Sequence, residues 1–332
     1  MKIHLTTLLI FFLTTSVLFA QKAINVSLYN EAAPVFVAES AALGHVAVRN
    51  MISLNSNDMD YSPLLYKDGI VFTSTRVFET KKKRWFKSYK KKFSYLFFAK
   101  RDERGQFNDP KPLEGGINGR YHEGAATFNK QGDVMFFTRN NKKGKNQFGK
   151  VDLKIYTAKF NDGNWDEIEE IEIINGEGFS TCHPTISADG QKLFFASNRN
   201  GGYGGMDIYV SYLVDGEWQY PVNLGPEINT DGNEIFPFIA QGNKLYFSSD
   251  GHDGKGGLDI FQSNWIDETN EEDWTTALNM GLPFNSVKDD FGFSIYNNNQ
   301  EGFFTSTREG GQGYDDIYTW RKEYIPRAEL SK

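Results

Sequence analysis

Cysteine is almost absent from this sequence: Cys182 is the only one in 332 residues. A single cysteine cannot form an internal disulfide, so the core must supply the stability of the fold. Cys182 lies in "STCHPTIS", at the start of an expected strand, and we interpret it as a small packed residue rather than a nucleophile. The five histidines are scattered without zinc or Ser–His–Asp spacing, and the net charge of −7 disfavours nucleic acid as a partner.

Long apolar runs are missing after residue 20, so no later segment is expected to cross a membrane. The first twenty residues, "MKIHLTTLLIFFLTTSVLFA", have the pattern of a secretory signal, with Lys2 before an apolar stretch and Ala20 at a small-ended cleavage site. A membrane anchor is the alternative interpretation. We expect an exported protein of the periplasm or outer membrane, with a signal peptide at 1–20, an N-terminal segment at 21–46 that forms a short helix or docks elsewhere, a main domain at 47–322 and a tail at 323–332.

Aromatic residues and glycine are abundant, with 28 Phe, 16 Tyr and 32 Gly, which favours strands joined by turns. Five apolar runs repeat one pattern: "IVFTSTR", "MFFTRNN", "LFFASNR", "LYFSSDG" and "GFFTSTR". Their anchoring aromatics lie 52 to 65 residues apart, at Phe72, Phe137, Phe195, Phe247 and Phe304. In the last three copies an Asp-Ile-aromatic run begins twelve residues after the anchor.

Each copy predicts four strands, and the second and third are joined by a glycine-rich loop such as "NRNGGYGG". Glycine there tolerates a positive φ, and the Asp after the loop can accept hydrogen bonds from loop amides. A four-stranded unit repeated about every fifty residues is typical of a propeller blade. We therefore predict an all-β fold, a five-bladed β-propeller of four-stranded antiparallel blades. The last copy lacks a fourth strand, and an early strand near residues 47–54 is expected to complete it and close the ring; an open solenoid is the alternative.

Two stretches, "HPTISADGQKLFFASNRNGGYGGMDIYVS" and "FPFIAQGNKLYFSSDGHDGKGGLDIFQS", resemble the WD40-like Pro-Asp repeats of TolB-type propellers. The resemblance covers about residues 47–322. It is close to the propeller portion of Bacteroidetes envelope proteins linked to gliding and type IX secretion, in which an OmpA-type domain usually follows the propeller. It implies a protein-binding or scaffold role in the cell envelope, with envelope proteins as partners.

One face of the disk should carry the starts of the first strands, the inter-blade loops and the glycine loops. The strand starts hold acidic residues and histidines whose side chains converge on the axis: Asp60, His122, Glu123, His183, Glu234, Asp289 and Asp290. Three interpretations of this ring stay open, namely capping of strand starts, binding of a cation or basic partner, and glycosidase carboxylates. We assign no catalytic residue, no metal ligand and no cofactor, and an axial cation has no further support.

Two groups of basic residues should lie on the same face. The first recurs four residues after the anchor and predicts a structural role in each blade: Arg76, Arg199 and Arg308. The second is the insertion "KKKRWFKSYKKK" at 81–92, which replaces the glycine loop of the first copy and includes Lys82, Arg84, Trp85 and Lys90. This insertion either docks an anionic glycan, lipid head groups or an anionic partner, or is a solvated hairpin.

The sequence thus predicts a non-enzymatic interaction module of the bacterial envelope. The alternative is a carbohydrate-active hydrolase that uses carboxylates at the propeller axis. An axial cavity with two carboxylates and aromatic walls would favour the hydrolase, and a narrow axis with a broad contact face would favour the scaffold.

Overall fold

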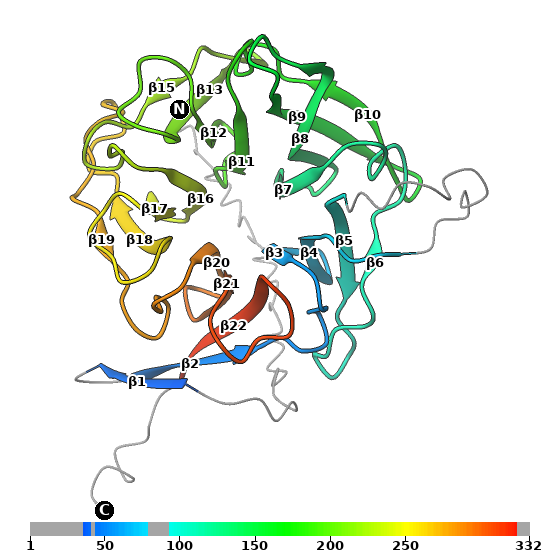
Figure 1. Ribbon diagram of the computed structural model, residues 1–332, viewed down its shortest axis with the longest axis vertical. Coiled ribbons are helices and arrows are strands. Elements are labelled where there is room, and N and C mark those ends of the chain that lie inside the picture. The colour runs from blue at the N-terminus through cyan, green and yellow to red at the C-terminus, as the bar shows by residue number, and fades with distance from the viewer. Residues whose placement is uncertain (1–35, 41–43, 79–92, 324–332) are drawn as a thin grey trace, which may run out of the picture.

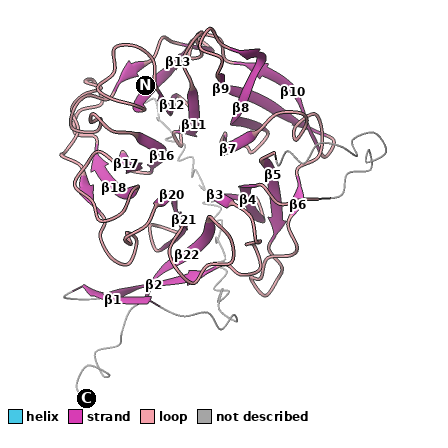
Figure 2. Cartoon of the chain, in the orientation of Figure 1, coloured by secondary structure: helices cyan, strands magenta, loops and turns pink. Residues whose placement is uncertain are grey.

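Five antiparallel sheets surround a central axis in the computed structural model, which describes residues 36–40, 44–78 and 93–323 (Figure 1). The secondary-structure elements in these ranges are all β-strands (Figure 2). The described residues include no helix long and apolar enough to cross a membrane. The predicted five-bladed β-propeller is therefore confirmed.

The first three blades follow the chain in order from the inner strand to the outer edge. Blade 1 holds β3 (Asp60–Tyr66), β4 (Gly69–Ser74), β5 (Tyr95–Lys100) and β6 (Lys111–Pro112). Blade 2 holds β7 (Glu123–Phe128), β8 (Val134–Lys145), β9 (Val151–Asn161) and β10 (Asn164–Glu170). Blade 3 holds β11 (Thr181–Ile186), β12 (Lys192–Ser197), β13 (Asp207–Val214) and an edge in two pieces, β14 (Glu217–Trp218) and β15 (Val222–Asn223).

Blade 4 repeats this order, and blade 5 joins the two ends of the domain. Blade 4 holds β16 (Glu234–Ala240), β17 (Lys244–Ser249), β18 (Asp259–Asn264) and β19 (Leu278–Asn279). Blade 5 holds β20 (Asp290–Tyr296), β21 (Glu301–Ser306), β22 (Asp316–Glu323), β2 (Gly44–Asn50) and β1 (Phe36–Ser40).

Strand β2 closes the ring by pairing antiparallel with β22, with Asn50 opposite Tyr318 and His45 opposite Glu323. The predicted closing strand is thus present. Residues 36–40 of the N-terminal segment form β1, which pairs with β2, so this part is extended where a short helix was one expectation. Pairing with β1 covers the outer edge of β2, which would otherwise expose unpaired backbone groups.

The doubled aromatic anchors arise because the second strand of each blade is buried on both faces. Successive strand residues point to opposite faces, so Phe194 packs into the core between blades 3 and 4 while Phe195 packs into the core between blades 2 and 3. Each pair of neighbouring blades shares one such apolar core, which makes five in all among the described residues. All five anchors are fully buried.

The glycine loops are glycine-rich mainly because each one lies against the next inter-blade loop. A Cβ atom would collide with a backbone carbonyl of that loop at Gly204, Gly256 and Gly313. A positive φ, the expected reason, applies at Gly201 and Gly310, at +92° and +90°. The Asp after each loop accepts loop amides as expected, for example Tyr203 N–H to Asp207 at 2.6 Å.

An asparagine in each inter-blade loop, buried or partly buried, fastens the third strand of the blade before it, and the sequence analysis did not identify it. In blade 3, Asn229 accepts the N–H of Ile208 at 2.7 Å and donates to its carbonyl at 3.0 Å. Asn55 makes the same pair of bonds with Ile317, at 2.8 Å and 3.0 Å, across the ring closure. The equivalent residues elsewhere are Asn118, Asn175 and Asn285.

We expect Asn55→Ala to lower the free energy of unfolding by about 2 kcal/mol, because the amide and carbonyl of Ile317 lose buried partners. Asn229→Ala is the matched control, since it removes the same bonds from a blade that is continuous in sequence. Both variants should show similar losses in urea unfolding, but only Asn55→Ala should speed amide hydrogen exchange in β2. Equal exchange in β2 for the two variants would contradict a closing role of Asn55.

Candidate functional site

The acidic residues at the strand starts are fully buried and bonded within their own blades. This applies to Asp60, Glu123, Glu234 and Asp290, which are at most 1% exposed. Asp60 accepts the amide and hydroxyl of Ser56, both at 2.6 Å, and Glu234 accepts those of Thr230 at 2.8 Å and 2.7 Å. Their carboxylates therefore hold the preceding inter-blade loops against the strand starts instead of converging on an open axis.

The arginines after the second strands bind these carboxylates. Arg308 pairs with Asp290 at 2.7 Å and donates to the carbonyl of Phe284 at 2.6 Å, and Arg76 pairs with Asp60 at 2.5 Å. In blade 3 the acid is replaced by threonine, and Arg199 donates to the carbonyl of Ile174 instead, at 2.6 Å.

Arg139 does the same work in blade 2 and was missed because it follows its anchor by two residues rather than four. It donates to Glu123 at 3.0 Å. Among the described residues, these arginines join the first two strands of a blade to its entry loop. We therefore assign these arginines a structural role, as the sequence analysis expected for Arg76, Arg199 and Arg308.

The other predicted residues lie in three different places. Asp289 is half-buried and accepts the amide of Leu258 at 2.9 Å, which fastens the glycine loop of blade 4. His122 and His183 line a cavity on the axis. The basic insertion, with Lys82, Arg84, Trp85 and Lys90, falls outside the described residues.

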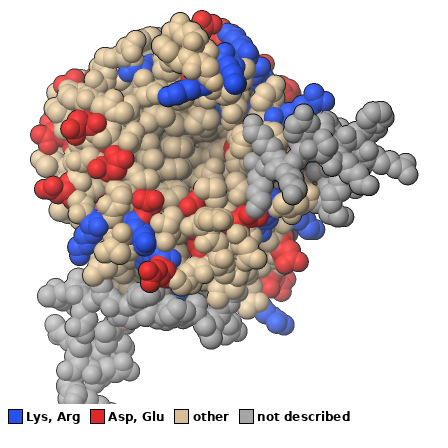
Figure 3. Space-filling view, viewed as in Figure 1, with Lys and Arg blue, Asp and Glu red and all other residues tan. Residues whose placement is uncertain are grey.

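The axial cavity has a volume of about 650 Å³ and opens where the first strands begin. The space-filling view shows the disk hollowed around its centre (Figure 3). Tyr61, Phe236 and Phe291 project from blades 1, 4 and 5 and contact one another, with Phe236 and Phe291 ring centroids 4.9 Å apart. The cavity therefore has aromatic walls.

Two carboxylates that the sequence analysis did not identify, Asp58 and Asp315, line the same cavity. They come from opposite ends of the domain and are brought together by ring closure. Tyr314 N–H donates to the Asp58 carbonyl at 3.2 Å, and Met59 forms a parallel β-bridge with Asp315. The exposed ring of Tyr314 lies on the rim beside them.

Asp315 is 9% exposed, and its side chain makes no hydrogen bond within the described part of the chain. Burial, reinforced by the charges of Asp289, Asp316 and Asp60, raises the pKa of Asp315 from 3.8 to about 6. A carboxyl group of this kind can hold a proton in mildly acidic solution and release it to a bound molecule. Burial also raises the pKa of Glu123, to about 7, but Glu123 pairs with Arg139 at 3.0 Å and does not line this cavity.

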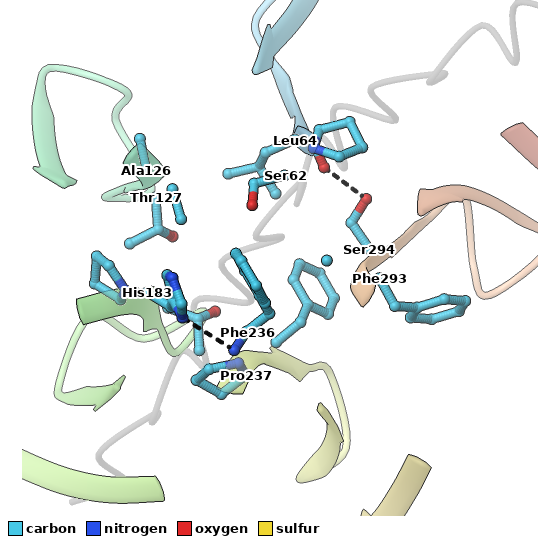
Figure 4. A pocket seen from close by; sticks show the side chains of 15 residues that line it. Ser62, Leu64, Ala126, Thr127, His183, Phe236, Pro237, Phe293 and Ser294 are labelled. Carbon is cyan, nitrogen blue, oxygen red and sulfur yellow. Dashed lines mark hydrogen bonds between the residues drawn. The ribbon is translucent and has the colours of Figure 1, made fainter. Parts of the chain in front are cut away.

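The imidazoles of the cavity are held by backbone groups. Ser94 N–H donates to Nδ1 of His122 at 3.2 Å. His183 stacks on Phe236, and both residues line the large cavity and a second one of about 40 Å³ among the inner strands, which Figure 4 shows. Burial lowers the pKa of His183 to about 3, so this imidazole is neutral at physiological pH.

No family model matches the chain, and no curated protein matches it. Solved structures do. A gluconolactonase from Xanthomonas campestris is 11% identical, with a TM-score of 0.48 over 89% of this chain and 99% of that one. An alpha-L-arabinofuranosidase from Lactobacillus brevis is also 11% identical, with a TM-score of 0.47 over 83% of this chain and 92% of that one.

A puromycin-hydrolyzing peptidase from Mycobacterium tuberculosis is 11% identical as well, with a TM-score of 0.42 over 87% of this chain. The chain spans 44% of the length of that peptidase. At these identities the likeness concerns the fold and assigns neither a substrate nor a reaction.

The prediction that the protein is not an enzyme is corrected here: the similar structures named above are enzymes, so the fold gives that prediction no support. That prediction rested on the resemblance to envelope propellers. The strand-start acids, which were the expected carboxylates of the hydrolase alternative, are bonded within the blades. The chain is a five-bladed β-propeller whose axial cavity joins aromatic walls, two histidines and two carboxylates.

Proposed function

We propose that the protein is a hydrolase, and specifically a glycoside hydrolase that binds a sugar ring in the axial cavity. The observation that carries the proposal is the buried carboxyl group of Asp315, which has a raised pKa, no hydrogen-bond partner among the described residues and a place in the cavity wall. Glycosidases use a protonated carboxyl group and a second carboxylate on either side of the scissile bond. Asp58 is the second carboxylate of the cavity.

In the proposed reaction Asp315 gives its proton to the glycosidic oxygen as the bond from that oxygen to the anomeric carbon breaks. Asp58 accepts a proton from a water molecule as the water oxygen bonds to the anomeric carbon, so the hydroxyl of water ends on that carbon and its proton on Asp58. The aromatic walls suit this role, because the apolar faces of a sugar ring pack on aromatic rings while its hydroxyls reach polar groups.

A screen of the purified protein tests this function. It uses 4-nitrophenyl glycosides of arabinofuranose, xylose, glucose, galactose and N-acetylglucosamine, together with glucono-1,5-lactone as a substrate of a different class. We expect turnover of at least one glycoside, at least 100-fold above Asp315→Asn. Turnover of the lactone alone, or of nothing above the Asp315→Asn background, would refute the glycosidase.

We also propose that the protein is exported and acts in the periplasm or at the outer membrane. The pattern of residues 1–20 and the resemblance to Pro-Asp repeat propellers of the envelope support this location. Envelope proteins, anionic glycans and lipid head groups are the partners expected for residues 81–92. Cell fractionation with an antibody to the propeller tests the location, and recovery in the cytoplasm would contradict it.

A further inference from the structure

His183 lies at the boundary between the two axial cavities, on a strand of blade 3, and contacts blade 4. Its ring stacks on Phe236 with centroids 3.7 Å apart and planes 13° apart. The backbone N–H of Phe236 donates to Nδ1 of His183 at 3.4 Å, as the dashed line in Figure 4 shows. The imidazole is therefore held in place by a ring and by a backbone group of the neighbouring blade.

This contact determines which ring nitrogen carries the proton. A neutral imidazole has one donor and one acceptor nitrogen, and Nδ1 is the acceptor here. The proton consequently resides on Nε2, which makes no hydrogen bond with any residue in the described ranges. Since His183 lines both cavities, this N–H is a fixed donor on the axis that the fold itself does not use.

The backbone of His183 has the conformation that recurs at the equivalent position of other blades, but its imidazole side chain occurs only in blade 3. Each inner strand has a bulge, and in four of the five blades the residue at this position is left-handed, with φ of 54° at His183, 53° at Ser62, 52° at Phe236 and 61° at Gly292. The equivalent residues of blades 2 and 5 are Ala125 and Gly292. The bulge is thus a structural feature shared among blades, whereas a hydrogen-bond donor of this size occurs only in blade 3.

We propose that His183 is a substrate-positioning residue whose Nε2–H donates to an uncharged oxygen, a hydroxyl or the ring oxygen, of a sugar lying on the aromatic walls of the cavity. The inference rests on the proposed function and specifies how the site selects its substrate. A site that hydrogen-bonds a substrate oxygen rejects analogues without that oxygen, because the protein donor is then buried unpaired. The neutral ring also adds no positive charge that would attract an anionic sugar.

Two substitutions test the role of His183 with the best glycoside from the screen. His183→Phe keeps an aromatic ring on Phe236 and removes the donor, and Phe is already tolerated at the same left-handed position in blade 4. His183→Gln replaces the donor by an amide of similar reach. We expect His183→Phe to raise KM at least tenfold with kcat changed less than threefold, and His183→Gln to restore most of the loss.

The outcomes separate this inference from the proposed function. If Asp315→Asn is inactive but His183→Phe has the KM of the native protein, the glycosidase stands and the role of His183 is refuted. If Asp315→Asn retains full activity, Asp315 is not the general acid and the proposed reaction fails. In that case, or if no glycoside is cleaved, long-range ¹H–¹⁵N spectra of the full chain titrated with free arabinose, xylose and glucose decide the inference: a shift of the His183 Nε2 signal supports it, and an unchanged signal refutes it.

Discussion

Replacement of Asp315 by asparagine is expected to lower kcat for glycoside hydrolysis by about 100-fold to 10,000-fold, which is the usual contribution of a general acid. Asparagine has nearly the shape of aspartic acid but carries no proton that it can transfer. The binding cavity should keep its form, so KM should change little. An Asp315→Asn variant as active as the native protein would exclude Asp315 from the reaction.

The same substitution should make the folded protein more stable. Between pH 4 and pH 6 the folded state binds the Asp315 proton more tightly than the unfolded state does, because burial raises the pKa of Asp315 from 3.8 to about 6. Stability therefore falls as pH rises through this window, and the full cost, at most about 3 kcal/mol, applies above it. Asparagine avoids this cost.

Urea unfolding at pH 4 and pH 8 measures the effect. Asp315→Asn and the native protein should differ little at pH 4, and the variant should be more stable by about 1–3 kcal/mol at pH 8. Asp315→Met is a second variant drawn from the repeat, since Met206 is the equivalent residue of blade 3, and it should be stable and inactive as well. An equal difference at both pH values would show that the pKa of Asp315 is not raised.

Asp289→Asn is the matched control for charge. Asparagine can still accept the amide of Leu258 through its side-chain oxygen, so the glycine loop of blade 4 stays in place. Removal of the Asp289 charge lowers the pKa of Asp315, because that charge is one of the causes that raise it. The variant should remain active. As pH rises, its activity should fall at a lower pH than that of the native protein, because Asp315 loses its proton earlier.

The repeat made the fold predictable from the sequence, and it also hid the candidate site. Phe195, Phe247 and the other anchors recur at near-constant spacing because each blade needs the same two-faced strand. The closing strand followed from a simple count, since the last copy lacked a fourth strand. These features depend on local pattern, which a single sequence displays.

The candidate site depends on departures from that pattern. Asp315 stands where blades 3 and 4 have Met206 and Leu258, and the doubled acid in "YDDIY" was the signal that could have identified it. The recurring acids at the strand starts drew attention instead, although a group needed once per blade is expected to be structural. Which acids are paired depends on contacts between residues as distant as Asp58 and Tyr314, and the spacing in the sequence does not reveal these.

Arg308→Met is expected to cause the largest loss of stability, about 3–5 kcal/mol, because it leaves the fully buried carboxylate of Asp290 without its cation. Blade 3 offers the matched control, since Thr181 stands in place of the acid there and Arg199 binds a carbonyl and a hydroxyl instead. Arg199→Met should therefore cost only about 1–2 kcal/mol, the value of lost neutral hydrogen bonds.

The double variant Arg308→Met with Asp290→Thr separates loss of the ion pair from loss of packing. This variant gives blade 5 the threonine of blade 3 and leaves no buried carboxylate without a cation. It should therefore recover at least half of the stability lost in Arg308→Met. Urea unfolding of the four proteins at pH 7.5 completes the comparison. If Arg308→Met and Arg199→Met lose the same stability, or if Asp290→Thr restores nothing, then the arginine acts through its contacts with Phe304 and Tyr318 rather than through the carboxylate.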